Sequence, residues 1–196
     1  MIDRLRTLCW TALVLVSLVE FPALSQTDFQ TEFRQIAQLL RLDAGTVVAD
    51  VGAGGGSWSR LLADSVGSDG HVFATDVRPE VLPGILAGTR QAQNVTVVLG
   101  SQDTTGLPPQ CCDAVLLRLV YHAFKKPDLM RRSLARAVRP GGRVLIIDFP
   151  GGALGVIPAD LERDMTHSGF VKAGFVDGWQ GQQSVYGILF RKLPLN

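Results

Sequence analysis

Short apolar runs alternate with amphipathic segments along most of the chain. Five of the runs are apolar at nearly every position and rich in β-branched residues, which is typical of buried strands. They cover residues 46–51, 71–76, 95–99, 114–117 and 143–148. Because strands of this kind that alternate with helices form a parallel sheet covered on both faces, the pattern predicts a three-layer α/β fold.

Helical spacing and boundary residues predict the segments between these strands. Apolar residues recur at helical spacing before the first strand, at Phe29, Phe33, Ile36, Ala37 and Leu40. We expect Ser57 to cap the helix after the first strand, and a glycine-containing helix over residues 79–91. Pro127 should open the helix before the fifth strand, and Pro140-Gly141-Gly142 should stop it.

The carboxyl-terminal part of the chain has a different order. A short helix near residues 159–166 is followed by two strand candidates, at 170–179 and 184–191. Only residues 180–183 join these two candidates. A link this short forces an antiparallel pair, since a parallel crossover needs roughly a dozen residues or more. The complete expectation is a seven-stranded, mostly parallel sheet with a carboxyl-terminal antiparallel hairpin.

The first 25 residues have the features of a secretory signal. Arg4 and Arg6 precede an apolar run over residues 8–19, and Ala23-Leu24-Ser25 supplies a small-residue exit. The run is shorter than the roughly 20 residues of a membrane-spanning helix. We expect a signal peptide or anchor over 1–25, with membrane association through it, and one domain over 26–196. We therefore expect the protein to be exported or anchored in a membrane. The alternatives for residues 1–25 are a buried amino-terminal helix and an anchor that leaves the domain in the cytoplasm.

Composition fits a folded domain without a polyanionic partner. The chain is 46% hydrophobic and 19% charged, with a formal net charge of +1, which excludes a disordered or strongly basic protein. The arginines near residues 131–139 have no aromatic residues among them, so we expect a solvated face and no nucleic-acid partner. Cys111 and Cys112 are adjacent without other ligands at zinc spacing, so we expect a structural role and no metal.

A glycine loop follows the first strand. Gly52, Gly54 and Gly56 alternate from the end of that strand to the start of a helix, with Ala53 between the first two and Asp50 just before them. Such glycines let a ligand lie against bare main chain, and the helix start favours an anionic group. The third glycine of a dinucleotide motif is replaced by serine, and no P-loop lysine is nearby.

Four ordered motifs resemble those of class I S-adenosylmethionine-dependent methyltransferases. The loop has the D-x-G-x-G-x-G pattern of motif I, and Asp76 ends the second strand. Residues 100–108 resemble the adenine-binding segment, and residues 139–145 resemble the P-G-G signature before the fifth strand. Residues 117–124 are similar to a "YHHF" stretch of the small-molecule (type 11) group related to ubiquinone and menaquinone biosynthesis. The resemblance covers about residues 32–192.

This resemblance implies a Rossmann-like fold and S-adenosyl-L-methionine as the cofactor. Asp76, with Val77 beside it, would accept hydrogen bonds from the ribose hydroxyls. Gln102 or Asp103 would take the adenine amino group, and we favour Asp103. The glycine loop and Asp50 would lie along the rest of the cofactor.

Catalytic candidates come from the segment after the fourth strand. His122 stands where a general base would be useful if the acceptor must lose a proton. Tyr121 could pack against the sulfonium or form a wall of the cofactor pocket. Arg118 could hold a carboxylate or phosphate of a ligand, and we group it with the cofactor residues. Ala123 replaces the second histidine of the resembled stretch, so no histidine pair is present there.

The expected activity is in-line methyl transfer to a small-molecule acceptor. The stretch over residues 149–168 is too short for a separate cap domain, which fits an open pocket and a small or amphipathic substrate. Two alternatives stay open. One is a nicotinamide-dependent oxidoreductase, since an acidic residue after the second strand also binds ribose there. The other is a non-catalytic exported protein that retains the fold.

Overall fold

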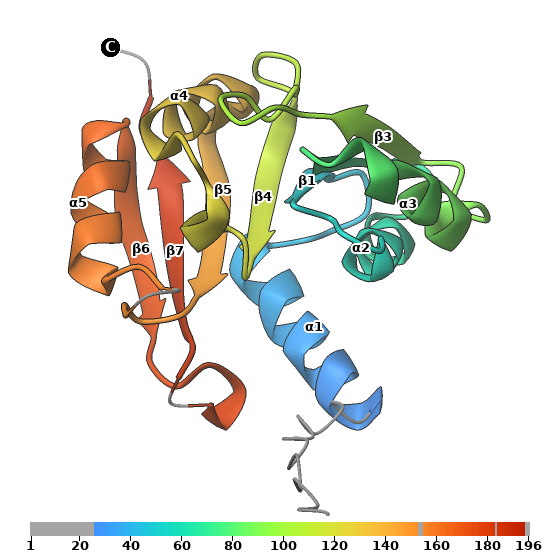
Figure 1. The fold of residues 1–196 in the computed structure, drawn as a ribbon. Helices are drawn as coiled ribbons and strands as arrows, with labels where there is room; N and C mark the ends of the chain where they lie inside the picture. The colour runs from blue at the N-terminus through green and yellow to red at the C-terminus, as the bar shows by residue number, and fades with distance from the viewer. Residues whose placement is uncertain (1–25, 153–154, 183, 195–196) are drawn as a thin grey trace, which may run out of the picture.

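A seven-stranded sheet forms the middle layer of the molecule (Figure 1). The computed structural model describes residues 26–152, 155–182 and 184–194, so the predicted signal lies outside the described residues. The strands are β1 (Val47–Val51), β2 (His71–Asp76), β3 (Val95–Leu99), β4 (Cys112–Arg118), β5 (Val138–Asp148), β6 (Phe170–Val176) and β7 (Tyr186–Lys192). Their order is β3-β2-β1-β4-β5-β7-β6; β1 to β5 are parallel and β7 is antiparallel to both of its neighbours. The predicted fold class is confirmed.

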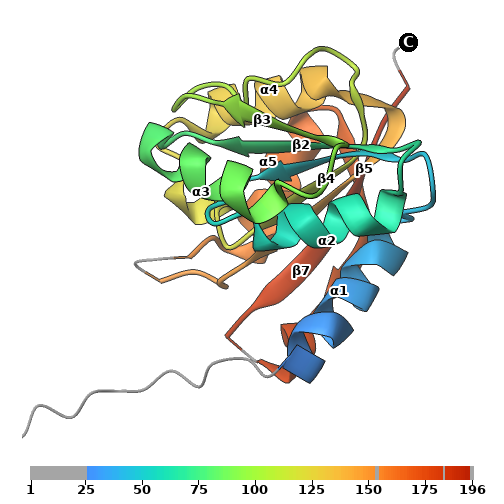
Figure 2. The ribbon, with the colours of Figure 1, turned by 90° about the vertical axis from the view of Figure 1, so that its right-hand side faces the viewer.

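Helices cover both faces of the sheet. The helices are α1 (Gln26–Leu40), α2 (Ser57–Val66), α3 (Leu82–Thr89), α4 (Pro127–Ala137) and α5 (Pro158–His167), with short 3-10 turns at Pro79–Val81, Tyr121–Ala123 and Trp179–Gly181. Figure 2 shows α1 and α2 below the sheet and α4 above it. Within the described ranges, none of these helices has the length and apolarity needed to cross a bilayer.

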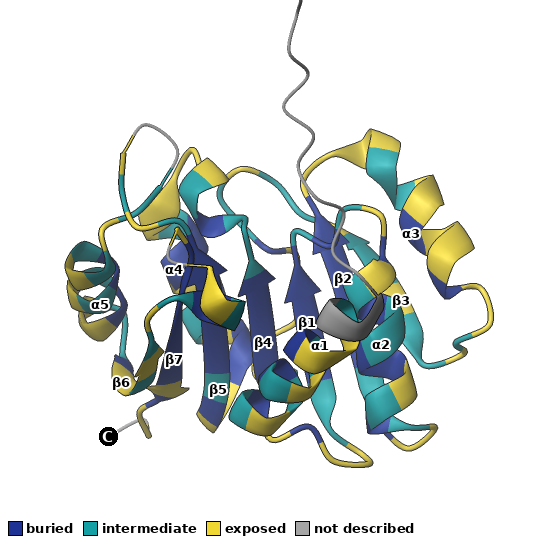
Figure 3. Cartoon of the chain, turned by 90° about the horizontal axis from the view of Figure 1, so that it is seen from below, coloured by how far each residue is buried: buried dark blue, intermediate teal, exposed yellow. Residues whose placement is uncertain are grey.

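The central strands carry the core, as Figure 3 shows for β1, β4 and β5. One apolar cluster joins the sheet to α1 and α2 through residues such as Ile36 and Leu62. A second joins the opposite face to α4 and α5 through Leu134 and Met165. These four side chains are fully buried, and each contributes roughly 1.5–3 kcal/mol by leaving water. Both faces are thus anchored, which explains why the strands are apolar at nearly every position.

The start of β5 differs from the prediction. We expected Pro140-Gly141-Gly142 to lie between the helix and the fifth strand, but α4 ends at Ala137 and β5 already begins at Val138. The register against β4 shifts between Cys112 and Ala114, so the proline and glycines occupy a bulge within the strand. Proline and glycine are tolerated at such a bulge because it interrupts the ladder of hydrogen bonds.

The basic stripe on α4 is not wholly solvated. Arg131 is buried, and its Nη1 donates to the hydroxyl of Tyr121 at 2.8 Å. The same nitrogen lies 3.4 Å from Oδ2 of Asp164, and the guanidinium also pairs with Asp128. The expectation of a solvated face was therefore wrong for this arginine, which joins α4 to α5 and to the turn after β4. Arg132 and Arg136 are exposed on α4, as predicted. Arg139 is also exposed, but it lies in β5 and pairs with Asp113.

A carboxylate lies in the core at the end of β1. Asp50 is 3% exposed and accepts a hydrogen bond of 2.6 Å from the hydroxyl of Ser59 in α2. Burial is the main cause that raises the pKa of Asp50 to about 6, against an ordinary 3.8. The folded chain therefore holds a proton here that the unfolded chain has lost, and the free energy of unfolding falls as pH rises from about 4 to about 6.

We expect Asp50→Asn to stabilise the protein at pH 7.5 by up to about 3 kcal/mol, because it removes this unfavourable buried charge. At pH 4 the gain should be close to zero, since the native carboxyl group is then protonated. Urea unfolding at the two pH values measures the difference, with the exposed Asp69→Asn as a control without the effect. An equal gain at both pH values would show that ionisation of Asp50 is not the cause.

Candidate functional site

The glycine loop after β1 lies against the end of β2. The amides of Gly52 and Ala53 both donate to the carbonyl oxygen of Thr75, at 2.8 and 3.0 Å. Gly52 has a φ of +80°, and a Cβ on it would lie 2.4 Å from Cγ2 of Val120. Conformation and space therefore both require glycine at this position. The loop sits at the carboxyl edge of the sheet, between the ends of β1, β2 and β4.

The helix after this loop begins without the side-chain cap that the sequence predicted. Gly56 occupies the N-cap position with a φ of 80°, and no side chain caps the first turn. Ser57 is the first helical residue and is exposed, so the expectation that it caps α2 was wrong. Close packing favours glycine rather than a capping residue at the N-cap position, because a Cβ on Gly56 would lie 3.1 Å from Cα of Ile85.

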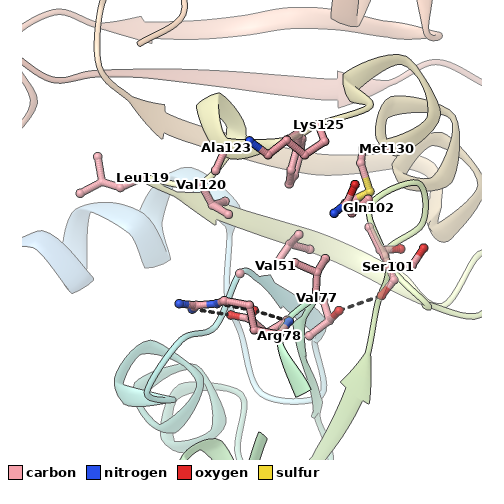
Figure 4. Close-up of a pocket in the computed structure, with 15 residues that line it drawn as sticks. Val51, Val77, Arg78, Ser101, Gln102, Leu119, Val120, Ala123, Lys125 and Met130 are labelled. Atoms are coloured by element: carbon pink, nitrogen blue, oxygen red, sulfur yellow. Dashed lines mark hydrogen bonds and ion pairs between the residues drawn. The ribbon is translucent and has the colours of Figure 1, made fainter. Parts of the chain in front are cut away.

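A cavity of about 400 Å³ opens beside the loop (Figure 4). It is lined by the end of β1 with Gly52, by residues 75–78 at the end of β2, by Ser101, Gln102 and Thr105 after β3, by residues 119, 120 and 123–125 after β4, and by Met130 of α4. The wall is thus built at the carboxyl ends of four neighbouring parallel strands, where open α/β sheets place their ligands. The volume is typical of a small-molecule or cofactor site.

Asp76 supplies the buried carboxylate of this cavity. Its side chain is 4% exposed and receives the backbone amide of Gly54 at 3.1 Å. The amide and guanidinium of Arg78 also donate to it, at 3.0 and 3.1 Å. Burial alone would raise the pKa of Asp76, but these hydrogen bonds together hold it below its ordinary value. Asp76 is therefore ionised at neutral pH and faces the cavity beside Val77, which also lines it.

The loop after β3 presents Gln102, rather than Asp103, to the cavity. Gln102 is one of the lining residues. The carboxylate of Asp103 instead accepts from the hydroxyl of Ser101 and lies 3.4 Å from Nζ of Lys126. These two partners, the serine first, lower the pKa of Asp103. The sequence analysis favoured Asp103, but only Gln102 of the two lines the cavity. Which of them binds adenine stays a prediction.

Tyr121 lies in the core instead of the cavity wall. Its side chain is 4% exposed, packs on Phe124 with ring centroids 5.3 Å apart, and accepts the hydrogen bond from Arg131. Burial raises the pKa of Tyr121. It is not among the residues that line the 400 Å³ cavity. The structure gives this tyrosine a packing role under the turn that carries His122.

His122 is held by a buried carboxylate that the sequence analysis left without a role. Nδ1 of His122 lies 2.7 Å from Oδ1 of Asp148, and its backbone amide donates to Oδ2 at 3.0 Å. Asp148 ends β5, is fully buried, and also receives the amide of Phe149 at 2.8 Å. Because a carboxylate only accepts, Nδ1 is the donor, and the neutral ring carries its lone pair on Nε2. His122 is itself absent from the lining of the 400 Å³ cavity, but its neighbour Ala123 belongs to it.

Arg118 lies apart from the glycine loop in a second cavity of about 260 Å³. Its guanidinium donates to both carboxylate oxygens of Glu32 in α1, at 2.8 and 3.0 Å, and stands over the ring of Trp58 at 4.8 Å. The indole of Trp179 also donates to Glu32 at 2.8 Å. Leu119 lines both cavities, so the two adjoin at the end of β4.

The predicted cofactor residues therefore divide by position. The cavity of about 400 Å³ beside the glycine loop is called the main cavity below. The predicted residues that line it are Gly52, Asp76, Val77 and Gln102. The others are Asp50, Ala53, Gly54 and Gly56 in or behind the loop, Asp103 beside Lys126, and Arg118 in the second cavity. Sequence reasoning missed several polar residues near these cavities, among them Asp148, Arg78 and Glu32. Of these, Asp148 alone carried a signal, since it ends a predicted strand at the same edge as Asp76.

The two described cysteines stand at the opposite edge of the sheet from the cavity. Cys111 precedes β4 and Cys112 is its first, buried residue; both are free thiols, with Sγ atoms 2.7 Å apart. No group of three or more histidine, cysteine or acidic side chains suited to a metal occurs among the residues that the structure describes. The cysteine pair is therefore remote from any chemistry at the glycine loop.

Comparison with known proteins gives related sequences and folds. Over 119 residues the chain is 29% identical to a demethylmenaquinone methyltransferase of Listeria welshimeri, covering 59% of this chain and 50% of the relative. It is 30% identical over 122 residues to an arsenite methyltransferase of Halobacterium salinarum, covering 61% and 31%. The chain thus spans about half the length, or less, of these curated relatives. A solved SAM-dependent methyltransferase from Aquifex aeolicus has the same fold, with a TM-score of 0.71 at 21% identity over 82% of this chain and 89% of that one.

A family comparison covers the site itself. The family model described as "Methyltransferase domain" matches residues 49–146, which is half of the 196 residues. The match begins before the glycine loop and takes in Asp76, Gln102 and the turn that carries His122. The chain therefore belongs to this methyltransferase domain family.

Proposed function

We propose that the protein is an S-adenosylmethionine-dependent methyltransferase that acts on a small-molecule acceptor. The observation that carries the proposal is the meeting, in one cavity, of a glycine loop and the buried carboxylate of Asp76. The family and its methyltransferase relatives support the same reading. The alternative of a nicotinamide cofactor shares the carboxylate, but the relatives and the family model do not point to it.

The residues of the main cavity fit this cofactor. Asp76 is ionised and would accept hydrogen bonds from ribose hydroxyls. Gln102 has an amide that would pair with the adenine edge, and Val77 and Val120 offer apolar surface for the ring. Gly52 keeps main chain bare where a Cβ would collide with Val120. When bound, S-adenosylmethionine supplies an electrophilic methyl carbon attached to a sulfonium.

We propose His122 as the group that accepts a proton from the methyl acceptor. Asp148 fixes the ring through Nδ1, so Nε2 is the basic nitrogen. The backbone amide of His122 binds the other oxygen of the same carboxylate, which holds main chain and ring together. A base held in this way requires no reorganisation before it acts, and general-base catalysis typically contributes about 10²–10⁴-fold.

The second cavity supports a position for the acceptor. It adjoins the main cavity at Leu119, and its walls come from α1, the ends of β4 and β5, and the turn before β7. Its polar surface is formed by the paired Arg118 and Glu32 with Gln180 and Gln182. A neutral, hydrogen-bonding acceptor of modest size fits this lining better than a strongly charged one, because the two charges already neutralise each other.

Binding of S-adenosylhomocysteine tests the cofactor assignment. We expect Gln102→Ala to weaken binding about tenfold, the cost of one lost hydrogen bond of roughly 1–1.5 kcal/mol. Asp103→Ala is the matched control from the same loop and should leave the affinity unchanged, because its carboxylate is engaged by Ser101 and Lys126. Isothermal titration calorimetry measures both variants.

The same titration separates the competing functions. Tighter binding of NAD than of S-adenosylhomocysteine would replace the proposal by a nicotinamide-dependent enzyme. No binding of S-adenosylmethionine at millimolar concentration would favour a non-catalytic protein that keeps the fold. A larger loss in Asp103→Ala than in Gln102→Ala would show that the loop rearranges around the adenine.

Turnover tests the role of His122. A screen of metabolites for methyl acceptance comes first, and with the acceptor found we expect His122→Ala to lower kcat by about 10²-fold or more. Affinity for S-adenosylhomocysteine should change little, since His122 is outside the main cavity. The exposed His167 provides the matched control, His167→Ala, with wild-type turnover. Wild-type turnover in His122→Ala would exclude it as the base.

The location of the protein is a separate proposal. We infer export or membrane anchoring through residues 1–25, from the basic start, apolar run and small-residue exit of that segment. Amino-terminal sequencing of the protein made by its native host is the test. A mature protein that begins at Gln26 is the expected result for a cleaved signal. An intact Met1 on protein recovered from the cytosol would contradict export.

A further inference from the structure

The ribose-binding carboxylate is already saturated by donors from its own chain. Oδ1 of Asp76 receives the backbone amide of Arg78 at 3.0 Å and its Nε at 3.1 Å. Oδ2 receives the amide of Gly54 and Nη2 of Arg78, each at 3.1 Å. A carboxylate has about four lone-pair sites, and four N–H groups occupy them. Two hydroxyl donors of a ribose would therefore find no free acceptor on Asp76 in this arrangement.

The two kinds of donor differ in how easily they leave. The amides of Gly54 and Arg78 belong to the main chain and hold the carboxylate in place. The guanidinium of Arg78 is at the end of a side chain that is 55% exposed. Figure 4 shows it at the edge of the cavity, joined to the end of β2 by the drawn hydrogen bonds. Only the carboxylate of this ion pair is buried, so water can take up the exposed guanidinium when it leaves.

Resting on the proposed function, we propose that Arg78 sets the affinity of the cofactor site by competing with the ribose hydroxyls for Asp76. Its guanidinium occupies the two acceptor positions that the hydroxyls need and leaves when the cofactor binds. The two backbone amides stay, so the carboxylate keeps its direction while its partners are exchanged. Arg78 thus acts as a specificity-determining residue, because a ligand without ribose hydroxyls gains nothing by displacing it.

The test is calorimetry of S-adenosylhomocysteine with the purified protein and its variants. We expect Arg78→Ala to tighten binding by about threefold to fivefold, because the ion pair with Asp76 no longer has to break before the ribose hydroxyls bind. Arg78→Gln, which keeps most of the stem and loses the charge, should behave in the same way. Arg90→Ala is the matched control, since Arg90 is exposed at the end of α3 and outside this cavity.

A double-mutant cycle and a salt titration show whether the effect passes through Asp76. With Asp76→Asn as the background, Arg78→Ala should no longer tighten binding. Raising the salt concentration should narrow the difference in affinity between wild type and Arg78→Ala, because salt screens the exposed guanidinium of Arg78. Equal tightening in the Asp76→Asn background would overturn the proposal.

Three other results would also overturn it. Weaker or unchanged binding in Arg78→Ala, together with loss of binding in Asp76→Ala, would contradict competition while leaving the cofactor assignment intact. Tighter binding of adenosine 2′-phosphate than of adenosine, lost in Arg78→Ala, would make the guanidinium a ligand-binding group. Absence of binding to wild type and all variants would overturn the proposed function, and this inference with it.

Discussion

The amides of Gly52 and Ala53 donate to one carbonyl oxygen, that of Thr75, and the site is arranged around this pair of hydrogen bonds. The parallel register pairs Val51 with Thr75, so β1 and β2 end level and the loop turns directly onto its neighbour. That turn brings the amide of Gly54 onto Asp76 and leaves room for Val120 where a side chain at position 52 would stand. The ends of β1, β2 and β4 therefore meet at this contact.

Two buried carboxylates at this edge illustrate different electrostatic solutions. Asp148 receives two backbone amides and the Nδ1 proton of His122, so its charge is well solvated by the protein. Asp50 has a single side-chain donor in Ser59, and burial dominates. A carboxylate held in this way lowers stability at neutral pH, and such groups are commonly retained where a site needs them. The hydrogen bonds around Asp148 hold His122 in a fixed position. Asp50, in contrast, places an unfavourable charge directly behind the glycine loop.

The sequence predicted what depends on periodicity and on strand ends. The strands, their alternation with helices, and the placing of Asp76 at the cavity follow from apolar runs and from the level ends of a parallel sheet. Contacts between distant residues were beyond the same reasoning. Glu32 and Arg118, which form an ion pair, are 86 positions apart in the sequence. Tyr121 is buried and accepts a hydrogen bond from Arg131 on the next helix. Whether Gln102 or Asp103 faces the cavity depends on local partners, Ser101 and Lys126, that no spacing rule describes.

The position of β7 also governs the order in which the sheet can be assembled. β7 follows β6 in the chain, yet it lies between β5 and β6, and β6 has no other neighbour in the described sheet. During synthesis, β6 therefore emerges before any strand with which it can pair. The half of the sheet that contains β6 and β7 cannot form until Tyr186–Lys192 has been made. In the other half, β1, β2 and β3 can pair as they are made. The glycine loop and Asp76 belong to the early half, and Asp148 gains its antiparallel neighbour Tyr186 only in the late one.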